Sequence, residues 1–240
     1  MASQLIKAAK RLADDVDALS FAQPVTHVYN PLRYAWSAHQ AYLSQVTDEG
    51  ADVIFLGMNP GPWGMAQTGV PFGEIAAVRE FLGIEMPVDR PDNEHEKRPV
   101  QGFACPRSEV SGRRLWGLFR EKYKTRKRFF AKQFVVNYCP LVFMESSARN
   151  RTPDKLPAAE REQLDAACDR HLQTVLATLQ PKHLVGVGVY AEKCLQRAIN
   201  AGAGTAKLSR ILHPSPASPA ANKDWSGKVT QQLIDAGIWK

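Results

Sequence analysis

The chain has 240 residues, of which 44% are hydrophobic and 23% are charged, and its formal net charge at pH 7 is +7. These values suit a globular protein with one sizeable core, so we expect a single domain over residues 1–240, and the positive charge modestly favours a polyanionic partner. No run of about 18 apolar residues occurs, and residues 1–20 lack the apolar core of a signal peptide; this excludes a membrane-spanning helix and predicts a soluble, intracellular protein.

Segments with helical spacing of apolar residues alternate with short apolar runs. The first segment places Leu5, Ala9 and Leu12 about one turn apart, with charged residues between them. Ser111 is the expected N-cap of a later helix, and His171 lies at the edge of an apolar helix face as a structural residue. In chain order we predict helices over 3–20 and 34–46, a strand over 53–56, helices over 74–82 and 112–123, a strand over 134–139, a helix over 158–179, a strand over 183–188, a helix over 190–199, a strand over 208–212 and a helix over 222–237.

This alternation predicts a three-layer α/β/α sandwich around a central, mainly parallel four-stranded sheet. The run over 53–56 is apolar throughout, as in a strand that is buried on both faces. The sequence VGVGVYAEK, which begins in the third strand, has an incomplete GxGxxG spacing and no following acidic partner for a ribose. We therefore discount a dinucleotide site.

The four cysteines are far apart and form no CxxC pair, which argues against zinc, an iron–sulfur cluster or a disulfide framework. We expect reduced thiols, mostly in the core, and a protein without metal or cofactor. The cysteines are Cys105, Cys139, Cys168 and Cys194.

Polar side chains follow three of the predicted strands. Asn59 lies in the loop GMNPGP, Asn137 lies near the end of the second strand, and His213 opens the loop HPSPASP after the fourth. Ligands of open α/β sheets bind beyond the carboxyl ends of the strands, so these residues are site candidates. Each also has a structural alternative: the asparagines can cap turns or strand ends, and His213 can be a hydrogen-bonded structural histidine.

A basic segment over 113–132 interleaves lysines and arginines with aromatic residues. Such a pattern is typical of a surface that contacts phosphates. It is equally typical of a solvated helix end whose aromatics belong to the core, and the sequence leaves both interpretations open.

The strings GMNPGPWGMAQTGVPFG, NYCP and HPSP together resemble the uracil-DNA glycosylase superfamily, and within it the single-strand-selective monofunctional enzymes. The likeness extends from about Tyr29 to Trp225. Other classes that resemble this chain carry an aspartate in a GQDPYH loop, or an asparagine in place of the HPSP histidine. The combination of Asn59 with His213 is the mark of the single-strand-selective class.

The resemblance implies hydrolysis of the N-glycosidic bond of uracil in DNA, as the first step of base excision repair. In this interpretation His213 donates a hydrogen bond to uracil O2 and stabilises the departing anion. Asn59 positions the attacking water, because an amide cannot act as a general base near pH 7. Both residues are therefore the expected catalytic groups.

The same resemblance implies the residues that bind the flipped base. Asn137 reads the edge of uracil that carries O4 and N3–H, Phe72 stacks on the ring, and backbone amides around Met58 contribute further contacts. Gly61 stands where stricter uracil enzymes carry a tyrosine, and the space that this leaves predicts activity on 5-hydroxymethyluracil. Asn59, Asn137, Phe72 and His213 should then converge on one slot. Phe72 alone would otherwise be interpreted as a core residue.

The HPSPASP loop is the expected DNA-contacting segment, and it departs from the family pattern. Its proposed contacts are Ser215, Pro216, Ala217 and Ser218. The family usually has an arginine in place of Ala217, and that arginine is thought to wedge into the duplex, so this chain is expected to be weaker on well-paired DNA. No Schiff-base lysine lies in the matched motifs, which predicts hydrolysis without strand cleavage.

Two alternative functions remain on the same fold. One is a mismatch-specific or hypoxanthine/xanthine-DNA glycosylase, and the other is a non-catalytic nucleic-acid-binding module. The expected partner in each case is DNA, single- or double-stranded, and for the uracil enzyme the DNA contains uracil. We expect a monomer in the cytoplasm of a bacterium or the nucleus of a eukaryote.

Overall fold

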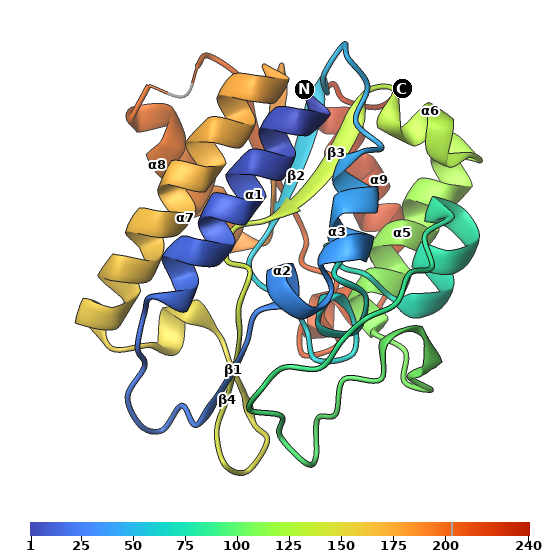
Figure 1. The fold of residues 1–240 in the computed structure, drawn as a ribbon. Helices are drawn as coiled ribbons and strands as arrows, with labels where there is room; N and C mark the ends of the chain where they lie inside the picture. Colours follow the sequence, from blue (N-terminus) through green and yellow to red (C-terminus); the bar gives the residue numbers. More distant parts are fainter. Residues whose placement is uncertain (203) are drawn as a thin grey trace.

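The computed structural model describes residues 1–202 and 204–240, and its centre is a parallel sheet with the strand order β3-β2-β6-β7 (Figure 1). All three pairings in this sheet are parallel, which confirms the predicted four-stranded sheet. The carboxyl ends of its strands therefore meet at one edge. The strands are β2 (Val53–Gly57), β3 (Gln133–Asn137), β6 (His183–Val187) and β7 (Lys207–Ile211).

Helices cover both faces of this sheet, so the three-layer architecture is confirmed. Figure 1 shows one group on the side of the N-terminal helix and a second group on the opposite side. The first group is α1 (Ala2–Asp17), α7 (Ala158–Leu179) and α8 (Val189–Asn200). The second group is α5 (Val110–Tyr123), α6 (Arg126–Phe130) and α9 (Trp225–Asp235).

The helix α3 (Trp36–Leu43) protects the free edge of β3. The hydroxyl of Tyr42 donates to the carbonyl of Val135 over 2.8 Å and accepts the Val135 N–H over 3.2 Å. The Tyr42 side chain thus pairs both backbone groups of Val135, which would otherwise lack a partner at the edge of the sheet.

A second, antiparallel sheet with the order β1-β4-β5 was not predicted. Its strands have two or three residues, too few for a hydrophobic period to appear in the sequence. They are β1 (His27–Tyr29), β4 (Val142–Met144) and β5 (Asn150–Arg151). In Figure 1 the β1–β4 pair lies at the end of the molecule toward which the strands of the parallel sheet point. It therefore borders the edge where a site is expected.

Several predicted helix boundaries are wrong. The first helix ends at Asp17 rather than at 20, and the last begins at Trp225 rather than at 222. The helix expected over 34–46 is divided at Ala35, where the backbone leaves the helical region between α2 (Pro31–Tyr34) and α3. Ser111 is not an N-cap, because α5 begins at Val110 and the residue before it is Glu109. The remaining short helices are α4 (Met65–Thr68), a π-helix over Ala77–Leu82, and 3₁₀ turns over Gly102–Ala104, Pro153–Lys155 and Pro219–Asn222.

The aromatics of the basic segment belong to the core. Trp116, Phe119 and Phe129 are fully buried and pack against one another, as the second interpretation of that segment expects of its aromatics. Whether its exposed lysines and arginines contact phosphates stays a prediction. Lys132 is paired with Glu49 and Asp52 at the amino ends of the strands, away from the edge described above. The four cysteines are buried free thiols, as expected. Of the helices in the described residues, none combines the length and apolarity needed to cross a membrane.

Candidate active site

A pocket of about 250 Å³ opens at the carboxyl ends of the parallel strands. It is smaller than the cavities of drug-sized ligands, roughly 300–1,000 Å³, and suits a single flat ring. The predicted residues among those that line it are Met58, Asn59, Gly61, Phe72, Asn137, His213 and Ser215. Pro60, Glu109, Ser111, Asn150 and Thr152 complete the lining. The four side chains that were expected to converge therefore share one pocket.

Asn59 is held in one orientation by the backbone that leaves β3. Its Nδ2 donates to the carbonyl of Leu141 over 3.1 Å. A carbonyl only accepts hydrogen bonds, so the NH₂ end of the amide must face Leu141 and Oδ1 is left as a free acceptor. Leu141 directly precedes β4, so the small antiparallel sheet contributes to this orientation.

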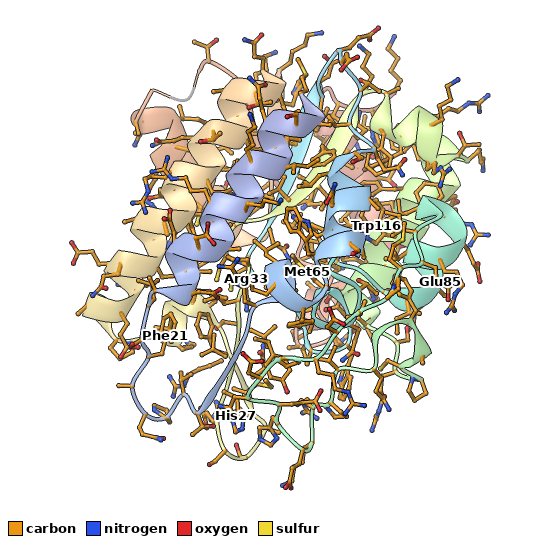
Figure 2. The ribbon with its side chains drawn as sticks, viewed as in Figure 1. Phe21, His27, Arg33, Met65, Glu85 and Trp116 are labelled. Atoms are coloured by element: carbon orange, nitrogen blue, oxygen red, sulfur yellow. The ribbon has the colours of Figure 1, made fainter. Side chains whose placement is uncertain are left out.

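Asn137 ends β3 and is paired in register with Gly57, the last residue of β2. The Asn137 residue is only 6% exposed, and its Oδ1 is buried without a hydrogen-bond partner. Its Nδ2 contacts Sδ of Met65 at 3.3 Å, and Met65 lies in the interior beside α2 (Figure 2). A Cβ atom at Gly57 would overlap both Asn137 Oδ1 and the ring of Phe72. Glycine is therefore required at the end of β2.

Phe72 has a backbone conformation that is unusual for a phenylalanine, with φ of 52°. Such strain persists only where the surroundings enforce it, and it is common at ligand sites. The neighbouring carbonyl of Pro71 accepts from Nε1 of Trp116 over 3.1 Å, which ties this loop to the core. The Phe72 ring centroid lies 6.4 Å from that of His213. An aromatic wall and an imidazole thus bound the same space.

His213 follows β7 and has a defined protonation state. Burial lowers its pKa below 6.5, so the ring is neutral at pH 7. Nδ1 accepts the backbone N–H of Ser215 over 3.1 Å, which places the single ring hydrogen on Nε2. Gly188, with φ of 90°, lets the backbone lie against the ring: a Cβ there would be 3.1 Å from Cβ of His213. The site therefore presents a neutral N–H donor.

The HPSPASP loop is braced by Arg114 of α5. The guanidinium donates to the carbonyl of Pro214 over 2.8 Å and to Oδ1 of Asn222 over 3.0 Å, and Asn222 donates back to the carbonyl of Pro216 over 2.8 Å. Of the four predicted DNA contacts, only Ser215 lines the pocket. Pro216 and Ala217 are exposed, and Ser218 is half-buried.

Glu109 lines the pocket although no sequence motif indicated it. Burial, with a contribution from the Glu74 carboxyl, raises its pKa to about 7. An acidic residue directly before a helix is ordinarily a partner of the helix dipole, and this is the signal that could have drawn attention to it. Here its side chain makes no capping bond.

An aromatic residue in the loop that follows β2 lies close to two cations. The guanidiniums of Arg98 and Arg107 lie 5.1 Å and 5.4 Å from the ring centre of Trp63, which follows Gly61 by two positions. Trp63 itself is half-buried. Cations beside an aromatic residue are a common pattern of surfaces that bind single-stranded nucleic acid. Within the parts of the chain that the structure describes, no group of three or more His, Cys, Asp or Glu side chains could hold a metal ion.

Comparison with known families decides the affiliation of this site. The sequence profile of the uracil DNA glycosylase superfamily matches residues 43–234, a segment that includes every pocket residue named above. The chain belongs to this superfamily. Within the superfamily it falls in the single-strand-selective monofunctional class, as the resemblance implied.

The relatives in the glycosylase superfamily cover almost the whole chain. The single-strand selective monofunctional uracil DNA glycosylase of Bos taurus is 45% identical over 238 residues, which are 99% of this chain and 88% of the relative. The corresponding enzyme of Mus musculus is 44% identical, with 99% and 85% covered. The crystal structure of wild-type SMUG2 from Pedobacter heparinus superposes with a TM-score of 0.68 at 14% identity, over 95% of this chain and 96% of that one. The last comparison shows the shared fold.

Proposed function

We propose that this protein is a monofunctional uracil-DNA glycosylase that hydrolyses the N-glycosidic bond and leaves the DNA strand intact. The observation that carries the proposal is the convergence of Asn59, Phe72, Asn137 and His213 on one base-sized pocket. The relatives at about 45% identity, named single-strand selective monofunctional uracil-DNA glycosylases, support both the activity and a preference for single strands.

His213 is proposed to stabilise the leaving group. Breaking the glycosidic bond develops negative charge on uracil, part of it on O2. The neutral ring offers its Nε2–H as a fixed donor, since Nδ1 is occupied by Ser215. A preorganised donor of this kind is worth roughly 10²–10³-fold in rate.

Asn59 is proposed to orient the attacking water through its free Oδ1. Positive charge develops on the sugar in the same transition state, so a neutral water is an adequate nucleophile and its placement limits the rate. The contact between Nδ2 and Leu141 keeps Oδ1 available for this task. No proton acceptor stronger than an amide is required.

Asn137 is proposed to select uracil over cytosine. Its buried Oδ1 lacks a partner and therefore needs a hydrogen-bond donor. Uracil supplies one at N3–H, whereas N3 of cytosine is itself an acceptor. Two acceptors facing each other in a buried pocket cost on the order of 1–3 kcal/mol, which disfavours cytosine.

The finer features of the activity are also proposals. The missing side chain at Gly61 supports acceptance of 5-hydroxymethyluracil. We further propose excision from double-stranded as well as single-stranded DNA, a role in base excision repair inside the cell, and action as a monomer. The Trp63 cluster with Arg98 and Arg107 supports contact with an unpaired strand.

The test is a panel of oligonucleotides that contain uracil, 5-hydroxymethyluracil, hypoxanthine or xanthine, each single-stranded and in duplex. We expect release of uracil by the wild-type protein, no covalent adduct after borohydride, and losses of roughly 10²–10³-fold for Asn59→Ala and His213→Ala. Asn200→Ala, on the exposed face of α8, is the matched control and should retain full activity. Unchanged excision in both site variants, or release of hypoxanthine or xanthine in preference to uracil, would contradict the proposal.

A further inference from the structure

In the described part of the chain, the side chain of Asn137 makes one hydrogen-bond contact, and its partner is Met65. Nδ2 of Asn137 lies 3.3 Å from Sδ of Met65, and the two residues are only 6% and 2% exposed. Met65 does not line the pocket; it lines an interior space of the core that Asn137 also borders. The sulfur therefore contacts the amide from the side of the core.

A thioether sulfur distinguishes the two ends of a carboxamide. Sulfur accepts a hydrogen bond and has no hydrogen to donate, so Met65 pairs with the NH₂ end of Asn137 and disfavours the oxygen end. Oδ1 lies beside Gly57 and the ring of Phe72, because a Cβ atom at Gly57 would overlap both. Met65 thus opposes a flip of the amide that would exchange Oδ1 and Nδ2.

The backbone that carries Met65 is held by its neighbours. Met65 begins the four-residue helix α4, and its carbonyl accepts the Gly69 N–H over 2.8 Å. The carbonyl of Ala66 accepts from the Tyr34 hydroxyl over 2.7 Å. The fully buried Gln67 donates from Nε2 to two backbone carbonyls, each over 3.0 Å. The turn that presents the sulfur is therefore fixed by the fold and does not depend on a bound base.

The orientation of the Asn137 amide decides which base it matches. With Oδ1 toward N3 and Nδ2 toward the group on C4, the amide is complementary to uracil, which carries N3–H and O4. With the two ends exchanged it is complementary to cytosine, which has an acceptor at N3 and an NH₂ group on C4. An amide that is free to flip therefore accepts both bases, whereas an amide held in the first orientation leaves polar groups of cytosine unpaired.

We propose that Met65 is a positioning residue that sets the preference for uracil over cytosine by holding the Asn137 amide in the orientation that matches uracil. This inference rests on the proposed glycosylase function. Met65 lies outside the lining of the pocket and acts through Asn137, so its replacement should change which base is bound while the pocket wall stays in place.

The test compares two single-stranded oligonucleotides of one sequence, which carry either 2′-fluoro-2′-deoxyuridine or 2′-fluoro-2′-deoxycytidine. Fluorine at C2′ disfavours positive charge on the sugar, so each oligonucleotide resists cleavage and competes with a uracil substrate. The ratio of their inhibition constants measures the preference in binding. Met65→Leu removes the acceptor at similar volume and should lower the preference for the uracil analogue about threefold to tenfold. Met65→Gln is a second variant and should also lower it, because its amide donates as well as accepts.

Two controls separate positioning from a merely structural role. Met144→Leu makes the same exchange at a fully buried methionine in a separate apolar cluster, and it should keep the wild-type ratio. In an Asn137→Ala background, Met65→Leu should change the ratio no further, since the amide through which it acts is gone. Thermal unfolding of each variant establishes that the protein under test is folded.

The outcomes also separate this inference from the function on which it rests. If the wild-type protein releases no uracil, the proposed function itself fails. If it releases uracil and the ratio is unchanged in Met65→Leu and Met65→Gln, only the role of Met65 is overturned. A proportional loss of affinity for both analogues, or an equal effect of Met65→Leu in the Asn137→Ala background, would overturn it as well.

Discussion

The backbone N–H of Ser215 donates a hydrogen bond to Nδ1 of His213 across 3.1 Å. Since burial also lowers the pKa of His213 below 6.5, the ring is mostly neutral at pH 6.5 and above. We expect the single-turnover rate of uracil release to stay level as the pH falls through 6.5 and to decline only below it, where a second ring proton would break the Ser215 contact. A pH–rate profile measures this. An acid limb centred above 6.5 would show that another group controls the rate.

Gly57→Ala should damage the pocket directly. The new Cβ overlaps Asn137 Oδ1 and the Phe72 ring, and overpacking of this kind costs about 1–3 kcal/mol of unfolding free energy. Uracil release should fall by about 10² or more, because two groups that we propose bind the base are displaced together. Urea unfolding and single-turnover kinetics measure the two effects. Gly117→Ala, in α5 with open space around its Cβ, is the matched control and should stabilise the protein by about 0.5–1 kcal/mol without loss of activity.

Ala217→Arg should improve excision from duplex DNA. Ala217 is exposed, and its N–H donates over 3.2 Å to the hydroxyl of Ser215, which lines the pocket. A long side chain at this position can therefore extend without disturbing the loop. An arginine there can fill the gap left by the flipped base and offset part of the flipping cost of a few kcal/mol. We expect a several-fold higher rate for uracil opposite adenine and little change in single strands. If the wild-type protein excises uracil equally fast from single strands and from duplex DNA, and Ala217→Arg has the same rates, then alanine at this position does not weaken activity on duplex DNA.

Buried histidines should make the fold sensitive to acid. Burial lowers the pKa of His39 and of His171 from 6.5 to about 4. In the unfolded chain these histidines become protonated below about pH 6.5, whereas in the folded chain they stay neutral until about pH 4. The free energy of unfolding therefore falls as the pH drops across this window. For His39, whose Nδ1 lies 2.7 Å from the Gly69 carbonyl, the loss by pH 5 is about 2 kcal/mol. Urea unfolding at pH 7 and pH 5 measures it, and His39→Gln should weaken the dependence. An equally steep dependence in that variant would assign it to other groups.

The parallel sheet and the long helices could be predicted from sequence because their hydrophobic periods are local. The helix over Ala158–Leu179 has the predicted bounds, and the strand bounds differ by one or two residues. The antiparallel sheet escaped because its strands are too short to show a period. The break at Ala35 escaped because neither proline nor glycine marks it. These features depend on tertiary packing rather than on local propensity.

The site residues also fall into those that the sequence predicts and those that it does not. Asn59, Asn137 and His213 directly follow or end apolar runs, so parallel strands alone place them at a common edge. Glu109 comes from a segment without a motif. It reaches the pocket only because the start of α5 packs against the Gly61–Gly64 backbone, more than forty positions earlier in the chain. Contacts between segments so distant leave no trace in a local pattern.

The three-residue strand β1 supports the orientation of a side chain in the pocket. Its pairing with β4 fixes the chain that immediately follows Leu141, the residue whose carbonyl aims the Asn59 amide. A substitution near His27–Tyr29 is therefore expected to misorient the Asn59 amide and to slow turnover, while the four-stranded parallel sheet stays folded. Through this pairing, β1 supports the orientation of Asn59, the residue proposed to position the attacking water.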